Sequence, residues 1–526
     1  MEQENSYDEF PYISYPFPYT RPEHFMTIGK LFCMTLPAME NARVLELGSA
    51  CGGNLINFAS DYPNSYSIGI DLSKVEIENG TKIIKDLGLT NIELKAMSIT
   101  DVDESFGKFD YIICHGVFSW VPDFVKDKIL EVSKKLLNPN GIAFVSYNTL
   151  PGWNMVNSIR DMMMFHAEIF NSPIDKINQA KLFLDFINEA LEGSSGPYAK
   201  FLKEEALHLA KQEDQYFLHE YLIGENKQFY FHEFIDMAKS QQLSYLADAH
   251  IHAMFLGNLP EKVATKLASI NDIVRTEQYM DFVQNKRFRS TLLCHDNVHL
   301  NRNITSEKIK EFYSSCNLIA SKPENEVDFS NSLETISFYF NNSKDSSISS
   351  SSPIMKAIFY VYAENIGNPL TSSELFKLAS KKLSKVSIKD IETEFDNVIG
   401  KLVFGAYVKL FAIKPKAVSN ISKSPKATDN ARYQARNANL NRLFVTNQLN
   451  EMFPLQIHEK YILELLDGSR DLKKISEEIL EKFTSGEIIA SNSGSNITDK
   501  VALETLARQC VDAALEKFRV NYLLVG

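Results

Sequence analysis

The sequence predicts an α/β protein with a doubly wound sheet, a helical insertion and additional, mostly α-helical domains toward the C-terminus. Three observations support this prediction. Short apolar runs alternate with amphipathic stretches from Arg43 onward, and the segment between Trp153 and Gly224 shows helical patterns without strand signals. A chain of 526 residues is also too long for one hydrophobic core, which indicates several domains.

The strands of the sheet are predicted from runs that are continuously apolar. Such runs suit strands covered on both faces, and the helix-like segments between them imply parallel pairing. Five runs lie in the first third of the chain: RVLELG, YSIGID, NIELKA, FDYIIC and GIAFVSYN. Beyond the helical segment, two further strands near residues 244–249 and 291–295 are expected to return to the sheet.

Four domains are expected. Residues 1–160 with 226–300 form the nucleotide-binding core, and 161–225 a helical insertion that is a candidate dimerisation element. Residues 301–415 form a winged-helix-like middle domain, because three helical patterns precede a strand, and 416–526 a small helical C-terminal domain. The serine-rich stretch 341–352 has the composition of a flexible linker.

Composition excludes several classes of function. The net charge of -12 and the pI of about 5.5 argue against a protein that mainly neutralises nucleic-acid phosphates. The six cysteines are scattered, and the HEF and LHE triplets are too short for metal motifs, so we expect no metal site and place both triplets on helical surfaces. A secretory signal and membrane-spanning windows are missing from the sequence, which predicts a cytoplasmic protein without membrane insertion.

The stretch VLELGSACGGN, residues 44–54, predicts a strand-to-helix turn that holds a nucleotide. It lacks the GxxxxGK[ST] pattern of a P-loop and the GxGxxG spacing of a dinucleotide turn. A carboxylate at Glu46 would repel a pyrophosphate but stabilise the ammonium and sulfonium of S-adenosylmethionine. Asp71, at the end of the second strand, is placed to bind a ribose diol, although capping of the next helix is an alternative role.

The remaining cofactor contacts follow from the same turn and from the next strands. After the third strand, AMSIT contains no acid, so an apolar wall with a hydroxyl or backbone donor is expected to hold the adenine. Tyr12 in the N-terminal arm is expected to close over the cofactor, with packing on the core as the alternative. The predicted cofactor-binding residues are Tyr12, Glu46, Gly48, Ser49, Ala50, Gly52, Asn54, Asp71, Leu72, Ser98, Ile99 and His115.

The loop after the fourth strand, CHGVFSWVP, is expected to face the acceptor. It lacks the Asn/Asp-Pro-Pro-Tyr/Phe tetrapeptide that holds planar nitrogens, which favours an aliphatic amine, an oxygen or a small molecule as acceptor. Core packing of Phe118 and Trp120 and a structural role for His115 are the alternatives. The predicted catalytic residues are His115, Phe118, Trp120, Tyr147 and Asn148.

Several motifs together resemble a known family: YDEFPYISYPFPYTRP, VLELGSACGGN, IGIDLS, FDYIICHGVFSWVP and LNPNGIAFVSYNTLPGW. They are similar to class I methyltransferases with an attached regulatory domain, and within these to rickettsial protein lysine methyltransferases that modify an outer membrane surface protein. The resemblance spans residues 7–295 and departs from the group at Arg21 and at Ser49-Ala50-Cys51.

The resemblance implies a class I methyltransferase Rossmann-like fold and S-adenosylmethionine as cofactor. It also implies lysine side chains of an outer membrane protein as acceptor, and a homodimer. Nucleic acid is not expected as a partner. Two other functions remain open at this point: a methyltransferase of a small molecule or tRNA with the same cofactor pocket, and a non-catalytic regulator that binds the cofactor.

Overall fold

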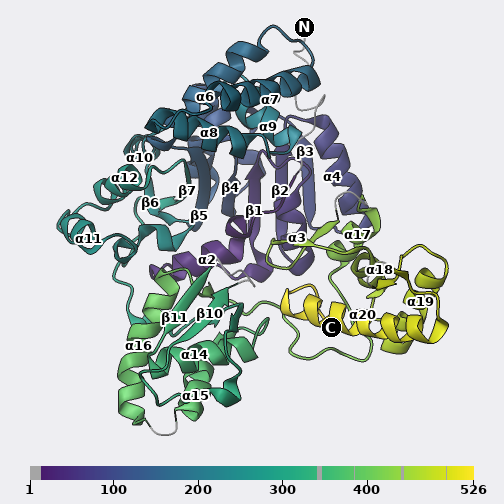
Figure 1. Ribbon diagram of the computed structural model, residues 1–526. Coiled ribbons are helices and arrows are strands. Elements are labelled where there is room, and N and C mark those ends of the chain that lie inside the picture. Colours follow the sequence, from purple (N-terminus) through teal and green to yellow (C-terminus); the bar gives the residue numbers. More distant parts are fainter. Residues whose placement is uncertain (1–13, 341–345, 384–385, 440–442, 493–494) are drawn as a thin grey trace. The chain divides into compact units, whose positions relative to one another are not determined.

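The chain folds as two compact units in this computed structural model (Figure 1). The structure describes residues 14–526 except 341–345, 384–385, 440–442 and 493–494. The first unit, called here the sheet unit, runs from the first described residues to Tyr15 and continues through 36–55 and 62–299. The second, the C-terminal unit, comprises residues 16–35, 56–61 and 300–526.

A seven-stranded sheet in the order β3-β2-β1-β4-β5-β7-β6 forms the centre of the sheet unit. Strands β1 to β5 pair in parallel, whereas β7 runs antiparallel to both of its neighbours, β5 and β6. The predicted fold class is confirmed, with a mixed sheet in place of a wholly parallel one. The strands are β1 (Arg43–Leu47), β2 (Tyr66–Asp71), β3 (Ile92–Ala96), β4 (Phe109–Cys114), β5 (Leu137–Asn148), β6 (Leu243–Asp248) and β7 (Phe288–His295).

Helices cover this sheet because their apolar stripes pack onto strands that are buried along most of their length. Ile129 of α5 and Phe234 of α10 pack in the same apolar core as Leu45 and Ile112 of the central strands. Outside the helical insertion, the helices of the sheet unit are the first turn of α3 (Gly53–Asp61), whose residues 56–61 belong to the C-terminal unit, α4 (Lys74–Asp86), α5 (Asp123–Leu136), α10 (Phe231–Ser240), α11 (Glu261–Ala268) and α12 (Ile273–Gln284).

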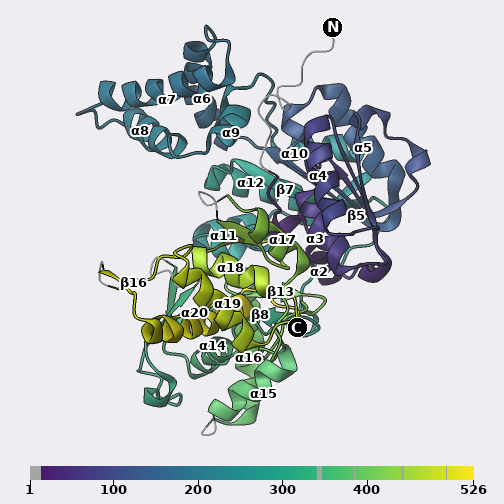
Figure 2. The ribbon, with the colours of Figure 1, turned by 90° about the vertical axis from the view of Figure 1, so that its right-hand side faces the viewer.

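The helical insertion predicted between β5 and β6 is present and has a core of its own, which includes Trp153, Met163 and Leu184. Figure 1 shows α6 to α8 at the end of the sheet where β5 leads into α6, and Figure 2 shows them extending away from α4 and α5. The elements are α6 (Gly152–Ala167), α7 (Pro173–Ala190), α8 (Pro197–Leu209), α9 (Asp214–Phe217) and the π-helical turn η6 (Leu218–Leu222).

The C-terminal unit combines helices with small antiparallel sheets around two apolar cores. Its helices are α2 (Pro22–Leu31), α13 (Ser306–Ile309), α14 (Pro353–Glu364), α15 (Ser372–Lys382), α16 (Ile388–Phe404), α17 (Asp429–Asn437), α18 (Ile457–Leu465), α19 (Leu472–Thr484) and α20 (Lys500–Val520). Its strands are β8 (Tyr313–Ser315), β9 (Leu318–Ala320), β10 (Ile336–Phe340), β11 (Ser347–Ser350), β12 (Leu370–Thr371), β13 (Lys409–Phe411), β14 (Phe444–Thr446), β15 (Met452–Pro454), β16 (Ser491–Asn492) and β17 (Ser495–Asn496).

Two expectations about this unit need correction. The serine-rich stretch predicted as a linker contains β11, which pairs with β10, and the hydroxyls of Ser337 and Ser349 lie 2.8 Å apart across the pair. Residues 16–35, expected in the nucleotide-binding core, instead pack in the C-terminal unit, where Leu31 joins an apolar core with Phe338. Within the described part of the chain, no helix is long and apolar enough to span a membrane.

Candidate functional site

The strand order of the sheet places a ligand site between β1 and β4. From β1 the chain proceeds outward through β2 and β3, then returns to β4 and continues outward on the other side. Ligands of open α/β sheets bind beyond the carboxyl ends of the strands at such a switch point. Glu46 of β1 lies level with Ile113 of β4, so the glycine turn and the His115 loop leave the sheet side by side.

The glycine turn is held tightly against its neighbours. The backbone N–H groups of Gly48 and Ser49 both donate to the carbonyl of Ile70, at 2.9 Å. Gly48 has φ +78°, and a Cβ there would lie 2.3 Å from Cγ2 of Val117 in the loop after β4. Only glycine combines this φ with this approach. The turn then closes through Gly52 N–H, which donates to the Ser49 carbonyl.

Glu46 is the most unusual group in the site. Its side chain is 1% exposed, and Oε1 accepts a 2.6 Å hydrogen bond from Nδ2 of Asn54. Oε2 is buried and has no hydrogen-bond partner among the described residues. The pKa of Glu46 is raised to about 8, chiefly by burial; the hydrogen bond from Asn54 acts to lower it and the negative charge of Asp71 acts to raise it. A buried carboxylate oxygen without a donor suits a ligand that brings a cationic N–H group.

Asp71 fixes the turn from the second strand. Oδ2 accepts from the Ala50 backbone N–H at 2.8 Å and Oδ1 from the Ser73 N–H at 2.9 Å. The alternative role as the cap of α4 is wrong, because the Ser73 hydroxyl accepts from the N–H of Glu76 in the first turn of that helix. Asp71 therefore holds Ala50, which has φ +44°, and keeps its carboxylate at the end of β2 beside Leu72, which is 63% exposed.

The expected adenine wall is only partly as predicted. The Ser98 hydroxyl accepts from the Thr100 N–H at 3.2 Å, so its oxygen is engaged in a local turn. Ile99 needs correction, because its side chain packs in the apolar core of the sheet and leaves its backbone for any ligand contact. Tyr12, predicted to close over the cofactor, lies outside the described residues.

His115 follows β4 directly and is a candidate for the acceptor side of the site. Its ring stacks on Phe144 at 5.9 Å between centroids and lies 6.2 Å from the ring of Phe288. Its pKa is lowered to about 4, chiefly by burial and in part by the nearby His250. At neutral pH the imidazole is therefore uncharged, which suits a position beside a cationic cofactor and a cationic acceptor.

Two predicted catalytic residues need correction. Phe118 is 0% exposed and packs edge-on against Phe234 with 5.3 Å between ring centroids. Tyr147 is 1% exposed, stacks on Phe234 at 4.1 Å, and its hydroxyl lies 3.1 Å from that of Thr291. Rings that are enclosed by the apolar core of the sheet unit have no surface left for an acceptor, so both residues are part of that core.

Trp120 and Asn148 remain candidates for the acceptor side. Trp120 ends the 3-10 turn η5 (Phe118–Trp120), is partly exposed, and lies 6.5 Å from the ring of Trp153. The backbone N–H of Asn148 donates to the hydroxyl of Ser119 at 2.9 Å, and its Nδ2 donates to Oδ1 of Asn226 at 3.1 Å. The end of β5 is thereby tied both to the loop after β4 and to the segment that leaves η6.

Sequence reasoning missed Glu220. The LHE triplet was expected on a helical surface, which is wrong: residues 218–222 form a π-helical turn, His219 is 5% exposed, and Glu220 is partly buried. Burial raises the pKa of Glu220 to about 7, while a hydrogen bond from the Asn148 side chain and the charge of Arg160 act to lower it. The only feature of the sequence that could indicate this partly buried carboxylate is the polar His-Glu pair within an apolar stretch. It is a weak indication, because distant segments of the chain determine whether a carboxylate is buried.

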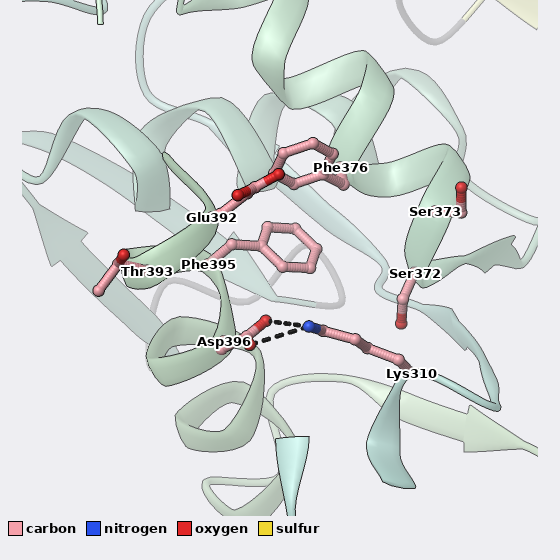
Figure 3. A pocket seen from close by; sticks show the side chains of 8 residues that line it. All are labelled: Lys310, Ser372, Ser373, Phe376, Glu392, Thr393, Phe395 and Asp396. Carbon is pink, nitrogen blue, oxygen red and sulfur yellow. Dashed lines mark hydrogen bonds and ion pairs between the residues drawn. The ribbon is translucent and has the colours of Figure 1, made fainter. Parts of the chain in front are cut away.

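The C-terminal unit contains a separate hollow, with a cavity volume of about 500 Å³, shown in Figure 3. The aromatic rings of Phe376 and Phe395 meet edge-on at 5.4 Å, and Lys310 forms an ion pair with Asp396 at 2.7 Å. Lys310 and Asp396 are thus paired with each other, and the lining also includes the carboxylate of Glu392. Among the described residues, no group of three or more His, Cys, Asp or Glu side chains is arranged to hold a metal ion.

Comparisons with known proteins agree with this geometry. Three family models match: a methyltransferase domain over residues 38–220, a predicted methyltransferase regulatory domain over 213–295, and a PKMT C-terminal winged helix domain over 423–523. The structure of PKMT2 from Rickettsia typhi in complex with AdoHcy is 52% identical, with a TM-score of 0.92, and the match covers 98% of this chain and 100% of that one.

This chain belongs to the protein lysine methyltransferase family. The enzyme class and the cofactor, S-adenosylmethionine, are as expected from the sequence. The methyltransferase is also 47% identical to the uncharacterized protein RP789 of Rickettsia prowazekii (strain Madrid E), over 99% of this chain and 94% of that protein. The family model places a winged helix domain at residues 423–523, where a small helical domain was expected from the sequence. The winged-helix-like character of residues 301–415 stays a prediction.

Proposed function

We propose that this methyltransferase adds methyl groups to lysine side chains of an outer membrane protein, that it does so in the cytoplasm, and that it works as a homodimer. The observation that supports the cofactor site is the buried Oε2 of Glu46, without a donor, beside Asp71 at the switch point of the sheet. A cationic nucleoside fits this pair of carboxylates and a diphosphate does not.

Each residue of the cofactor site has a distinct role in the proposal. Glu46 binds the ammonium group of the cofactor, Asp71 accepts from the ribose diol, and the turn from Gly48 to Gly52 lets the backbone approach the ligand. When bound, S-adenosylmethionine supplies an electrophilic methyl group. Asn54 keeps the Glu46 carboxylate oriented, since it donates to Oε1 and leaves Oε2 for the ligand.

Lysine as acceptor sets a requirement for the protein. An ammonium group has no lone pair, so the side chain must lose a proton before it accepts a methyl group, and its ordinary pKa is about 10.4. The net charge of -12 attracts lysine-rich segments. The resemblance to lysine methyltransferases of rickettsial surface proteins supports the outer membrane protein as their source.

Mass spectrometry tests the substrate directly. Fragments of rickettsial outer membrane proteins are incubated with the enzyme and isotopically labelled cofactor, alongside RNA and metabolite pools. We expect label on lysine side chains of the protein fragments. Label in RNA or metabolites alone would favour the tRNA or small-molecule alternative. Calorimetric cofactor binding without label in any pool would favour a non-catalytic regulator.

The dimer proposal is supported by exposed apolar side chains on the helical insertion. Large apolar residues on α6 to α8 and in the turn after α6 are more than half exposed, which is unusual for a surface that stays in water. They are Phe165, Ile169, Ile174, Leu182, Phe186, Tyr198 and Leu207. A second copy of the same face would cover them with the symmetry that most homodimers use.

Analytical ultracentrifugation of a double variant tests the dimer. Phe165→Ser with Phe186→Ser removes two rings that are 76% and 57% exposed, so we expect a shift from dimer to monomer without loss of fold. The control, Phe124→Ser, removes a ring that is 65% exposed on α5, outside the insertion, and should leave the dimer intact. A monomeric wild-type protein would refute the homodimer.

A further inference from the structure

The π-helical turn η6 carries the carboxylate of Glu220, which the side chain of Asn148 at the end of β5 reaches. Residues 217, 218, 221 and 222 of this region are buried in the core of the insertion, so the chain is anchored on both sides of Glu220. Arg160 of α6 holds the exit of the turn, since its Nη2 donates to the carbonyls of Ile223 and Gly224 at 2.6 and 3.1 Å. π-helical turns are rare in proteins, and those that occur are often found at functional sites.

The segment after the turn returns to the acceptor side of the site. The N–H of Phe229 donates to the Asn148 carbonyl at 3.1 Å, and the N–H of Lys227 donates to the Ser119 carbonyl at 2.8 Å. The Asn148 side chain reaches both Asn226 and Glu220. Buried Nδ2 of Asn226 has no hydrogen-bond partner among the described residues, so this polar cluster has spare hydrogen-bonding capacity.

Aromatic rings flank the same cluster. Trp153 stacks on Tyr221 at 6.2 Å and 20° between planes, and meets Trp120 edge-on. Trp120 follows directly on Ser119, which accepts the N–H of Asn148. Aromatic faces attract ammonium groups and cover methylene chains, so the surroundings suit a lysine side chain.

We propose that Glu220, held by Asn148, binds the ammonium group of the acceptor lysine and takes its proton. The inference rests on lysine as the acceptor and adds the residue that prepares it. An N–H bond of the ammonium breaks, an O–H bond forms on the Glu220 carboxylate, and the nitrogen keeps the electron pair. The new N–C bond then forms as the S–C bond of the cofactor breaks, sulfur keeps that pair, and Glu220 returns its proton to water.

The charged groups around Glu220 are compatible with this role. Arg160, from α6, is the cation that acts on it, and it does not form a close ion pair because its Nη2 is engaged with backbone carbonyls. The pKa of Tyr221, on the same turn, is raised by burial and by the charges of Glu220 and of Glu205 in α8, while the charge of Arg287 acts to lower it. With its pKa raised to about 7 by burial, Glu220 is basic enough to accept a proton near neutral pH.

The first experiment measures proton linkage in calorimetry without cofactor. A lysine-bearing peptide from a methylated fragment is titrated into enzyme at pH 7 in two buffers of different ionisation enthalpy. At pH 7 about half of the Glu220 side chains carry a proton, and binding of an ammonium ion requires the ionised form. Wild-type enzyme should therefore release about half a proton per peptide bound. Glu220→Gln should release none and bind the peptide at least about tenfold more weakly. The same peptide with norleucine should bind both proteins equally.

The second experiment is a pH profile of methyl transfer. Wild-type activity should level off above about pH 7, whereas Glu220→Gln should fall about 100-fold at pH 7 and then rise tenfold per pH unit toward the lysine pKa. Glu220→Asp should retain the wild-type profile shape at reduced rate. Glu204→Gln, on a side chain that is 69% exposed in α8, is the matched control and should behave as wild type.

Cofactor binding by calorimetry shows whether Glu220→Gln is folded, and Glu220→Asp replaces it if it is not. Equal proton release, peptide affinity and pH profile in the folded variant and wild type would overturn the role of Glu220 while leaving lysine methylation in place. A wild-type enzyme that methylates no lysine would overturn the proposed function itself.

Discussion

At the scale of single residues, Glu46 combines two properties that are normally separate. One oxygen is satisfied by Asn54, which orients the carboxylate, and the other is buried without a donor. Burying a carboxylate oxygen without a partner costs free energy in the cofactor-free protein. The same deficit favours a cationic ligand, so in the proposed site we expect cofactor binding to relieve this local instability.

The first prediction concerns Glu46→Gln in the cofactor-free protein. The pKa of Glu46 is raised from 4.5 to about 8, so the folded state keeps this proton while the unfolded state loses it. Stability from this group is therefore full below pH 4.5 and is lost as the pH rises to about 8, by about 3 to 5 kcal/mol. Denaturant unfolding at pH 5 and pH 8, followed by tryptophan fluorescence, should show a smaller pH dependence in the variant.

Both tryptophans, Trp120 and Trp153, belong to the sheet unit, so their fluorescence reports on the right part of the chain. Glu93→Gln removes a carboxylate that is 48% exposed on β3 and should leave the pH dependence unchanged. An identical pH dependence in wild type and Glu46→Gln would show that Glu46 is not buried as described.

At the scale of elements, the turn between β1 and α3 is defined by backbone approach. Gly48 brings the turn onto Val117, and Gly80 lets α4 approach the carbonyl of Cys51, which would lie 2.5 Å from an added Cβ. These contacts place the glycine turn between the loop after β4 and the helix after β2. The ligand site is thus shaped by three connections of the sheet, each at the carboxyl end of its strand.

The second prediction separates strain from crowding with two glycine variants. Gly48 and Gly88 both have positive φ, +78° and +67°, but an added Cβ meets Val117 at the first and nothing within 4 Å at the second. Gly88→Ala should cost about 1 kcal/mol from backbone strain alone, and Gly48→Ala about 2 to 4 kcal/mol. Urea unfolding measures both, and Gly48→Ala with Val117→Ala should recover part of the difference. Equal costs at the two positions would argue against the close approach.

At the scale of the whole molecule, the chain enters each unit more than once. The segments 16–35 and 56–61 are separated from the rest of the C-terminal unit by more than two hundred residues, yet they belong to it. Asn57 donates to Oδ1 of Asn450 at 2.9 Å and accepts from Asn430 at 2.6 Å. Arg21, 6% exposed, binds Asp61 at 2.9 Å and Asn450 at 3.3 Å. The C-terminal unit is therefore incomplete without the early segments.

The third prediction tests this closure with Arg21→Met. The substitution keeps an apolar stem but leaves the carboxylates of Glu23 and Asp61 without their buried cation, so the C-terminal unit should lose about 2 to 4 kcal/mol. Far-ultraviolet circular dichroism detects unfolding of both units, whereas tryptophan fluorescence detects the sheet unit alone. The loss should therefore appear mainly in the dichroism transition.

Lys82→Met is the control for Arg21→Met. It removes an ion pair with Asp86 in which the lysine is 69% exposed, and should cost less than about 1 kcal/mol. A shift of the fluorescence transition alone after Arg21→Met would contradict the assignment of residues 16–35 to the C-terminal unit.

The sequence by itself determined the sheet, the cofactor and the family. Continuous apolar runs predict buried strands directly, and the spacing of Glu46, Gly48 and Asp71 is a local property of two strand ends. The tertiary structure alone decided which of the candidate side chains are buried in the core and which are left for a ligand. Phe118 and Tyr147 lie in the apolar core, and Glu220 is partly buried although a surface helix was expected. The environment of an aromatic ring or a carboxylate depends on segments far away in the chain, so the local sequence does not predict it. The same holds for residues 16–35, since the partners that draw them into the C-terminal unit lie beyond residue 299.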